Sequence, residues 1–225
     1  MKLGVVVPWR PRPTRIKAFS LTVNRLMDQF PNSTVYYADT EDEVFNVSGS
    51  RNQGCLSAIK DGCDMLLVVD ADTLLDKDAV EAAIVKAAAD NCLCLPFTAY
   101  NILFEQSSES LINGELTYEE AAVFGPDSAL EHPGGAYVLS SSTFLLLNGW
   151  DQRFVGWGYE DDAFLEGYRV YLGKDVERIE GYALALFHLD RDREYVEQNR
   201  ERLHEYRKKS KEEMFELIRG NMDVE

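Results

Sequence analysis

The sequence predicts an α/β fold in which a mostly parallel central sheet is flanked by helices and followed by a long C-terminal amphipathic helix. Over residues 3–96, short apolar runs of strand length alternate with segments of helical periodicity, as in consecutive βαβ units. The runs at residues 3–7 and 65–69 are apolar at nearly every position, which is typical of strands buried on both faces. Residues 191–219 are highly charged but carry apolar side chains near helical spacing, which predicts the terminal helix.

The predicted elements can be placed in chain order. Strands are expected at residues 3–7, 34–38, 65–69 and 92–96, and helices at residues 14–30, 50–60 and 78–90. Pro8 ends the first strand and Pro31 the first helix, because proline has no amide hydrogen with which to continue either element. Residues 106–127 are polar with weak periodicity and stay unassigned, whereas the glycines and tryptophans of residues 149–158 predict a shaped loop.

The composition predicts a chain that folds alone and disfavours polyanionic partners. Hydrophobic residues make up 45% of the 225 positions, enough for one sizeable core. A formal net charge of −16 repels nucleic acid and anionic membranes. A local basic cluster either contacts phosphate or forms a solvated surface, and the sequence supports both interpretations equally. This cluster consists of Arg10, Arg12, Arg15 and Lys17.

The cysteines and the N-terminal segment predict a soluble, cytoplasmic protein without a membrane span. The cysteines lie in or beside apolar runs without zinc-ligand spacing, so we expect buried free thiols in a reducing compartment. They are Cys55, Cys63, Cys92 and Cys94. The chain starts directly with the first apolar strand rather than with a signal peptide, and no segment reaches the roughly 18 apolar residues of a membrane span.

Polar side chains follow three of the predicted strands, at the point where each strand ends. In strand order they are Pro8-Trp9-Arg10, Asp39 and Asp70-Ala71-Asp72. Ligands of open α/β sheets bind beside the carboxyl ends of the strands, so we expect a site at this edge. Two carboxylates two residues apart suit a hard divalent cation. An exposed acidic turn would explain a single such triplet better, so the site needs support from elsewhere.

That support comes from a second acidic cluster at residues 156–162, Gly-Trp-Gly-Tyr-Glu-Asp-Asp. Neighbouring carboxylates repel one another and glycines add little to a core, so a ligand site explains this segment better than packing does. An acidic first helical turn is the alternative interpretation, and the two are compatible. His188 follows an apolar run at residues 182–187 and is a candidate third metal ligand, although a single histidine is more often structural.

Taken in order, these motifs resemble the GT-A (Rossmann-like) superfamily of glycosyltransferases. The nearest groups are the family 2 enzymes and the C-terminal catalytic regions of β-1,4-galactosyltransferases and polypeptide N-acetylgalactosaminyltransferases. The resemblance spans residues 1–190. It rests on the strand ending at Pro8, Ser50-Arg51-Asn52-Gln53-Gly54, Asp70-Ala71-Asp72, Gly134-Gly135-Ala136, Asn148-Gly149-Trp150-Asp151, the segment 156–162 and His188.

The resemblance implies an inverting, metal-dependent hexosyl- or N-acetylhexosaminyltransferase that uses a nucleotide-sugar donor, a UDP-sugar in particular. By this similarity Asp161 is the catalytic base with Glu160 beside it, and Asp72 and His188 hold Mn²⁺ or Mg²⁺ on the diphosphate. The residues implied for nucleotide-sugar binding are Pro8, Trp9, Arg10, Asp39, Arg51, Asn52, Asp70, Ala71 and Gly135. Those implied for acceptor binding are Trp157, Gly158, Glu160 and Asp162.

The resemblance and the pattern of the C-terminal residues together predict how the chain is divided and which partners it has. Residues 1–190 form the catalytic domain, and residues 191–225 form a helical extension that packs on it or on a partner subunit, in the latter case as a homodimer. The hydroxyl acceptor is a glycan, a protein or a modified nucleic-acid base, the last disfavoured by the net charge. The short chain fits a compact bacterial or phage enzyme. The donor sugar, the acceptor, the oligomeric state and the role of residues 106–127 stay open.

Two other functions compete with sugar transfer. A nucleotidyltransferase also places carboxylates and a metal on an α/β sheet, but it would need a glycine-rich phosphate loop that the segment after the first strand lacks. A sugar- or nucleotide-binding module without turnover is the second alternative, because a fold alone does not establish activity. The presence of Asp72, Asp161 and His188 speaks against it.

Overall fold

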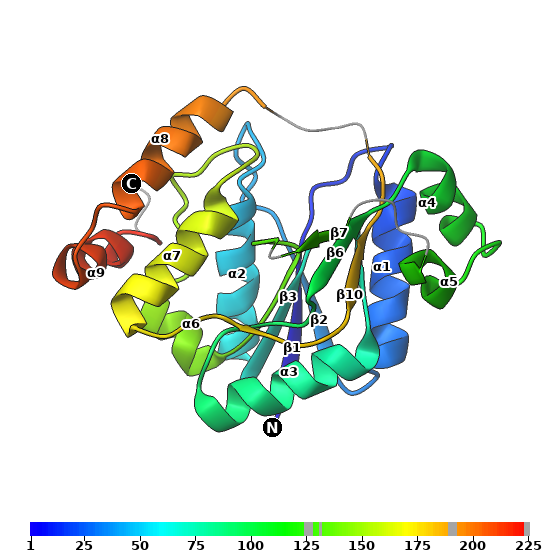
Figure 1. Cartoon of the computed structure of the whole chain (residues 1–225), viewed down its shortest axis with the longest axis horizontal. Coiled ribbons are helices and arrows are strands. Elements are labelled where there is room, and N and C mark those ends of the chain that lie inside the picture. The colour runs from blue at the N-terminus through cyan, green and yellow to red at the C-terminus, as the bar shows by residue number, and fades with distance from the viewer. Residues whose placement is uncertain (124–127, 131, 189–192, 223–225) are drawn as a thin grey trace.

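In the part of the chain that the structure describes, residues 1–123, 128–130, 132–188 and 193–222, a six-stranded sheet forms the centre of this computed structural model (Figure 1). Its strand order is β2-β1-β3-β8-β5-β9. The strands are β1 (Leu3–Pro8), β2 (Thr34–Ala38), β3 (Met65–Val69), β5 (Cys94–Leu95), β8 (Ala136–Ser140) and β9 (Glu177–Arg178). β1 pairs in parallel with β2 and β3, whereas β8 runs antiparallel to β3 and β5.

A smaller sheet lies beside the first, with the order β4-β10-β6-β7 in the described residues. Its strands are β4 (Thr73–Leu75), β6 (Ala99–Ile102), β7 (Ser128–Leu130) and β10 (Tyr182–Ala185). β4 follows β3 after only three residues, so the Asp70-Ala71-Asp72 turn links the two sheets. The smaller sheet thereby places the segment after β10 next to that turn, where the Leu186 amide donates to the Asp72 carbonyl.

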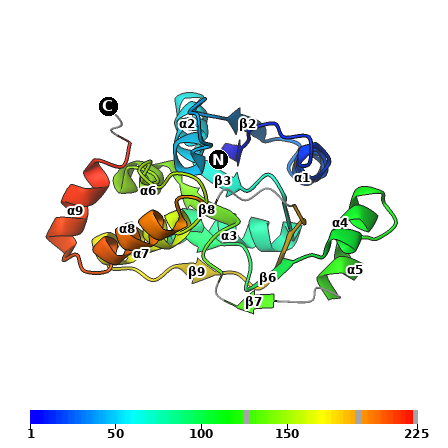
Figure 2. The same ribbon diagram turned by 90° about the horizontal axis from the view of Figure 1, so that it is seen from above.

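Helices cover both faces of the β2-β1-β3 part of the sheet. The helices in the described residues are α1 (Ile16–Gln29), α2 (Val47–Lys60), α3 (Lys77–Asp90), α4 (Glu105–Ile112), α5 (Tyr118–Val123), α6 (Ser141–Leu147), α7 (Glu160–Leu172), α8 (Val196–Tyr206) and α9 (Lys211–Arg219), of which α4 contacts α1 and α5, and α8 and α9 pack on α7. The chain moves from β1 outward to β2 and then back across to β3, and right-handed crossovers in opposite directions place α1 and α2 on opposite faces (Figures 1 and 2). The strand order therefore reverses beside β1, which is where open sheets bind ligands.

Close packing of α2 on β1 depends on one glycine. A Cβ atom built on Gly54 would lie 2.4 Å from Cγ1 of Val6. The helix therefore approaches the strand more closely than any side chain would allow. Asn46 caps the same helix by accepting from the Gly49 amide, which starts α2 three residues before the predicted position at residue 50. This packing fixes the distance between α2 and β1, and so the position of the α2 side chains that point toward the edge of the sheet.

The predicted fold is confirmed, and the strands expected at residues 34–38 and 65–69 have the predicted bounds. The cysteines are free and buried, as predicted. Residues 149–158 form an irregular loop in which Gly149, Gly156 and Gly158 have positive φ. The unassigned stretch 106–127 contains most of α4 and all of α5, which the weak periodicity did not reveal, and its residues 124–127 lie outside the described residues. Among the described helices, none has the length and apolar character to cross a bilayer.

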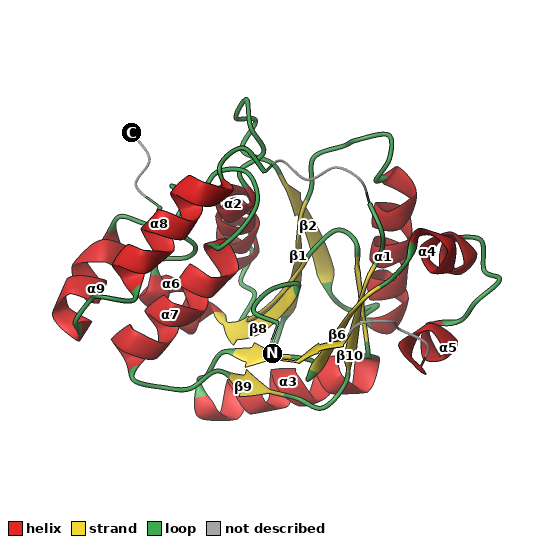
Figure 3. Cartoon of the chain, turned by 45° about the horizontal axis from the view of Figure 1, so that its top comes forward, coloured by secondary structure: helices red, strands yellow, loops and turns green. Residues whose placement is uncertain are grey.

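The C-terminal segment differs from the prediction in being two helices rather than one. α8 ends at Tyr206, and α9 begins after Ser210, which caps it together with Glu213 in a capping box. Both helices pack on α7, and Figure 3 shows the three side by side. Buried side chains of α7, α8 and α9 meet in one hydrophobic cluster, which includes Ala163, Leu203 and Met214. Predicted dimerisation through this segment stays a prediction, and residues 191–192 lie outside the described residues.

Candidate active site

The carboxyl ends of β1 and β3 and the segment after β10 border one pocket of about 410 Å³. Its lining combines residues from opposite ends of the chain, brought together where the strand order reverses. The predicted site residues among them are Pro8, Arg10, Arg51, Asp70, Ala71, Asp72, Trp157, Gly158, Glu160, Asp161, Asp162 and His188. Trp9, Asp39, Asn52 and Gly135 do not line the pocket.

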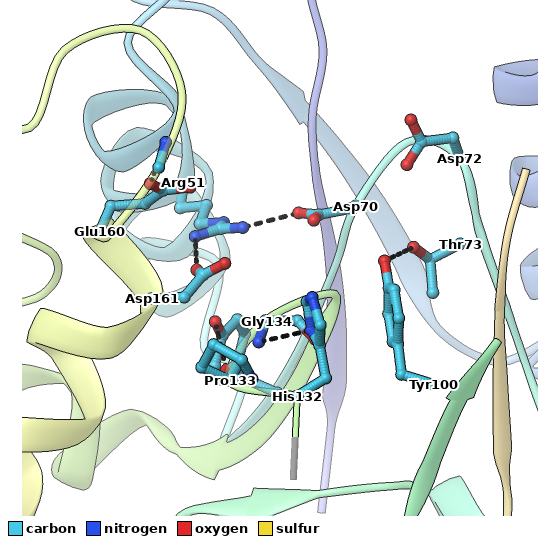
Figure 4. A network of polar contacts seen from close by, with 12 residues as sticks. Arg51, Asp70, Asp72, Thr73, Tyr100, His132, Pro133, Gly134, Glu160 and Asp161 are labelled. Atoms are coloured by element: carbon cyan, nitrogen blue, oxygen red, sulfur yellow. Dashed lines mark hydrogen bonds and ion pairs between the residues drawn. The ribbon is translucent and has the colours of Figure 1, made fainter. Parts of the chain in front are cut away.

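Arg51 is the buried charge at the centre of this site. It projects from α2, and its side chain is 1% exposed. Nη2 donates to Oδ1 of Asp70 at 2.7 Å, and Nη1 donates to Oδ1 of Asp161 at 2.6 Å (Figure 4). The guanidinium also lies 5.5 Å from the ring centres of Tyr137 and Trp150. One permanently charged group thus joins the end of β3 to the first turn of α7.

Asp161 is packed against the loop before β8. A Cβ atom on Gly134 would lie 1.9 Å from Oδ2 of Asp161, so only glycine leaves room for this carboxylate. The carboxylate is 15% exposed at the pocket wall. Asp161 and Asp162 occupy the first turn of α7, where the helix dipole favours negative charge. The acidic segment is thus both a first helical turn and part of the pocket, in line with both interpretations of the sequence.

Glu160 is the most deeply buried carboxyl of the segment 156–162. Its Oε2 accepts from the Gly158 amide at 3.0 Å, which closes the turn before α7. Burial, followed by the charge of Asp161, raises the pKa of Glu160 to about 8, while Arg51 opposes the rise. Burial and the Asp161 charge also raise the pKa of Asp162. Glu160 is therefore largely protonated at neutral pH, unlike an ordinary glutamate.

Asp70 lies between Arg51 and the far side of the pocket. Desolvation of its carboxylate and the charges of Asp161 and Asp72 raise its pKa, while Arg51 lowers it. Figure 4 shows Asp72 on the other side of Asp70 from Arg51. The turn after β3 thus presents one carboxylate to the buried arginine and the next to the segment after β10.

Asp72 and His188 meet across this pocket. Nε2 of His188 lies 3.2 Å from Oδ2 of Asp72, and both side chains are mostly buried. Arg15, at the start of α1, also reaches them: its Nη2 lies 3.2 Å from Oδ2 of Asp72 and 2.6 Å from Nε2 of His188. Arg15 belongs to the basic cluster noted in the sequence. That cluster predicted phosphate binding or solvent exposure, and it did not predict that Arg15 contacts Asp72 and His188.

The donor atoms of Asp72 and His188 fit two positions in the coordination shell of a divalent cation. Adjacent ligands about 2.1 Å from an octahedral ion lie about 3.0 Å apart, close to the observed separation of Oδ2 and Nε2. A carboxylate oxygen and an imidazole nitrogen also suit Mn²⁺. Within the described residues, no group of three or more His, Cys, Asp or Glu side chains is arranged for a metal. The phosphates of a nucleotide would have to complete the coordination.

Arg10 and Asp39 form a second ion pair, at the ends of β1 and β2. The guanidinium binds both oxygens of Asp39 at 2.7 Å and holds the pKa of this carboxyl below its ordinary value. Trp9 stacks on Phe19 of α1, with ring centres 4.1 Å apart. Arg10 thus faces the pocket, whereas the Trp9 ring packs on a helix.

Asn52 and Gly135 were predicted to bind the nucleotide-sugar, but neither residue lines the pocket. Asn52 is buried, and its side-chain amide binds both the carbonyl and the amide of Trp150 at 2.8 Å. This ties α2 to the loop after α6. Gly135 has a φ of 102°, and a Cβ atom there would lie 2.3 Å from the Tyr100 ring. Both residues shape the walls of the site without lining the pocket.

Tyr100 and His132 line the pocket but were not expected from the sequence. Their rings stack with centres 4.0 Å apart, and Nδ1 of His132 accepts from the Gly134 amide. His132-Pro133 directly precedes the Gly134-Gly135 pair, which was the signal available in the sequence. Tyr100 lies in β6 and carried no such signal, because a tyrosine in an apolar run is typical of any strand.

Comparisons with known proteins identify the family of this chain and structures of similar fold. Residues 22–170 match the family model described as glycosyltransferase like family 2. No curated protein matches the chain in sequence. A crystal structure of the catalytic domain of Drosophila β1,4-galactosyltransferase 7 with xylobiose is similar, with a TM-score of 0.61 and 17% identity over 93% of this chain and 82% of that one. A mutant of the same enzyme, in complex with manganese, UDP-Gal and xylobiose, has a TM-score of 0.60 and 17% identity over 93% and 80% of the two chains.

The buried ion pairs of Arg51 predict a large effect of its removal. In Arg51→Met, Asp70 and Asp161 lose their shared cation, and we expect the free energy of unfolding at pH 7 to fall by about 3–5 kcal/mol. Arg10→Met is the matched control, since its pair with Asp39 is more exposed and should be worth about 1 kcal/mol or less. Urea unfolding of both variants measures the difference. Equal losses would contradict the central role of Arg51.

The pKa of Glu160 predicts that stability falls as pH rises. Between pH 4.5 and about 8 the folded protein binds this proton and the unfolded chain has released it, so the free energy of unfolding decreases with pH. Glu160→Gln should therefore be more stable than wild type at pH 9, on the order of a few kcal/mol, with a smaller gain at pH 6 and no gain below about pH 4.5. Thermal unfolding at these pH values tests this. Glu205→Gln, at an exposed position in α8, should show no such pH-dependent gain.

Proposed function

Because this chain belongs to the glycosyltransferase like family 2, we propose that it transfers a sugar from a UDP-sugar to a hydroxyl acceptor with inversion at the anomeric carbon. The observation that carries the proposal is the convergence of Asp70, Asp72, Asp161 and His188 on one pocket at the edge of the parallel strands. The GT-A fold of the chain and the position of this pocket at the carboxyl ends of the strands support its assignment as a donor site.

In the proposed reaction the acceptor hydroxyl oxygen attacks the anomeric carbon of the donor. The bond from that carbon to the diphosphate oxygen breaks, and its electrons leave with the nucleoside diphosphate. The acceptor proton passes to the carboxylate of Asp161. Attack opposite to the leaving group inverts the anomeric centre. Arg51 and the surface of Gly134 hold the Asp161 carboxylate in place, so that it is oriented before the acceptor binds.

The donor half of the pocket is proposed to lie between β1 and β10. Arg10, held by Asp39, would border the nucleoside, and Asp70 would contact the ribose or the donor sugar. Asp72 and His188 would hold Mn²⁺ or Mg²⁺. When bound, that cation would stabilise the negative charge that develops on the departing diphosphate.

The acceptor half is proposed to lie over the loop before α7. Trp157 is 43% exposed at the rim of the pocket, where its ring also lies 5.4 Å from the guanidinium carbon of Arg193 and offers an apolar plate. A sugar face would pack on this ring. Asp162 lies on the same rim and would accept hydrogen bonds from acceptor hydroxyls, and Glu160 supports the turn from below.

Two features favour particular substrates for the first assays. The similar Drosophila enzyme was crystallised with UDP-Gal, which makes a UDP-hexose the first donor to test, with UDP-N-acetylhexosamines next. Its bound xylobiose makes a sugar hydroxyl the first acceptor to test. The binding-module alternative predicts nucleotide binding without turnover, so an assay of product formation separates it from the enzyme. Nucleotidyl transfer would instead release pyrophosphate.

The proposed donor site predicts coupled binding of nucleotide and metal. UDP should bind at least roughly tenfold more tightly with Mn²⁺ than without it, because the cation bridges the diphosphate and the protein. Asp72→Asn and His188→Ala should each remove most of that gain by deleting one ligand. Calorimetric titration with UDP measures both effects. Asp76→Asn, in the cap of α3, serves as a control for loss of a nearby carboxylate, and failure of UDP to bind wild type under either condition would overturn the donor assignment.

The proposed base predicts a selective loss of kcat. Asp161→Asn keeps an oxygen for Arg51 but cannot accept the acceptor proton, so kcat should fall by about 10²–10⁴-fold. The affinity for UDP with Mn²⁺ should change little. Asp162→Asn, one residue along, should raise the KM for the acceptor more than it lowers kcat. Wild-type turnover by folded Asp161→Asn would remove Asp161 from this role.

A further inference from the structure

Arg15 contacts both residues that are proposed to hold the metal. It lies directly before α1, 57 positions from Asp72 and 173 positions from His188. Its Nη2 atom lies 3.2 Å from Oδ2 of Asp72 and 2.6 Å from Nε2 of His188. These are the same two atoms that would coordinate a cation. The Nη2 atom of Arg15 thus lies within contact distance of both Oδ2 of Asp72 and Nε2 of His188.

The guanidinium and a divalent cation compete for this position. A guanidinium can only donate hydrogen bonds, so a ring nitrogen of His188 that binds Arg15 does so through its lone pair. Metal coordination needs a lone pair of that same kind. A divalent ion at this position would also meet the positive charge of Arg15 at contact distance. The two cations therefore exclude each other at the Asp72–His188 pair.

We propose that Arg15 is an internal counter-cation that occupies the Asp72–His188 pair until a nucleotide diphosphate binds and draws the guanidinium onto its phosphates, which opens the pair to the divalent cation. The proposal rests on the metal site of the proposed function and adds a regulation of that site. It assigns to Arg15 the coupling between nucleotide and metal binding.

Two observations favour departure of Arg15 from this position when phosphate is present. Its Nε is buried and has no hydrogen-bond partner among the described residues, so the observed position leaves one donor unsatisfied. Arg15 also lies at the N-terminus of α1, where the helix dipole disfavours a cation and favours an anion. A diphosphate offers acceptors to the free donor and neutralises the arginine at the same helix end.

The proposal gives the sign of the coupling. Nucleotide removes Arg15 from the metal ligands and so raises the affinity for Mn²⁺. By linkage, Mn²⁺ raises the affinity for nucleotide by the same factor. Without nucleotide, the cation must displace a guanidinium that is already bound to both ligands. The proposal therefore predicts weak metal binding to the nucleotide-free protein because Arg15 must be displaced, in addition to any effect of the small number of ligands.

The test measures Mn²⁺ binding to the full chain without turnover, by calorimetry and by the electron paramagnetic resonance signal of free Mn²⁺. Arg15→Gln should tighten nucleotide-free Mn²⁺ binding roughly tenfold more than Arg12→Gln does. Arg12 lines the same pocket, so this control removes an equal charge and accounts for long-range repulsion. UDP should then increase Mn²⁺ affinity less in Arg15→Gln than in wild type. Arg15→Lys should give an intermediate result, because an ammonium group keeps the charge without the planar fork.

Equal effects of Arg15→Gln and Arg12→Gln, or weaker Mn²⁺ binding in Arg15→Gln, would overturn the role of Arg15 and leave the proposed function intact. Asp72→Asn and His188→Ala separate the two hypotheses. If these variants bind Mn²⁺ with UDP as tightly as wild type, the metal site itself is elsewhere and both proposals fail. Thermal unfolding of each variant confirms that the protein is folded, and Arg15→Lys provides the comparison if Arg15→Gln does not fold.

Discussion

The buried guanidinium of Arg51 is the interaction on which the rest of the site depends. Asp70 and Asp161 come from different elements, and each would be costly to place in a partly desolvated pocket without a cation. Arg51 offers each of them one nitrogen, and its planar fork fixes the direction of both carboxylates. The end of β3, the first turn of α7 and the middle of α2 are therefore held in one arrangement by one side chain.

The acidity of the pocket raises the question of how it could bind an anionic donor. Four carboxylates at or beside the pocket form ion pairs with arginines. Asp39 pairs with Arg10, Asp72 with Arg15, and both Asp70 and Asp161 with Arg51. A diphosphate brings further negative charge, so binding requires either a new cation or a change of partner for an existing one. Asp72 and His188 could bind a new cation, and the arginines could change partner from a carboxylate to a phosphate. An excess of carboxylates is thus compatible with the proposed nucleotide binding.

The sequence predicted the parts of the fold that depend on local patterns. β1, β2 and β3 are continuous apolar runs, and their ends located the edge where the site lies. β5 and β9 are two residues long and could not be delimited, because such short strands are defined by their partners. The break between α8 and α9 did have a local signal, the capping box of Ser210 and Glu213, which the helical periodicity on either side obscured. Within the site, the carboxylates were predictable from strand ends. Their pairing was not, because Arg51 lies 110 positions from Asp161.

The segment Ser50-Arg51-Asn52-Gln53-Gly54 shows why a motif can locate a site without assigning the role of each residue. Arg51 turns toward the pocket and holds two carboxylates. Asn52, the next residue on the helix, points away and binds the backbone of Trp150. Gly54 contributes the absence of a side chain, which lets α2 contact Val6 of β1. All three lie on the same turns of α2, yet only Arg51 lines the pocket. The chemistry of the site is therefore carried by a few side chains, whereas the motif also specifies the packing that aims them.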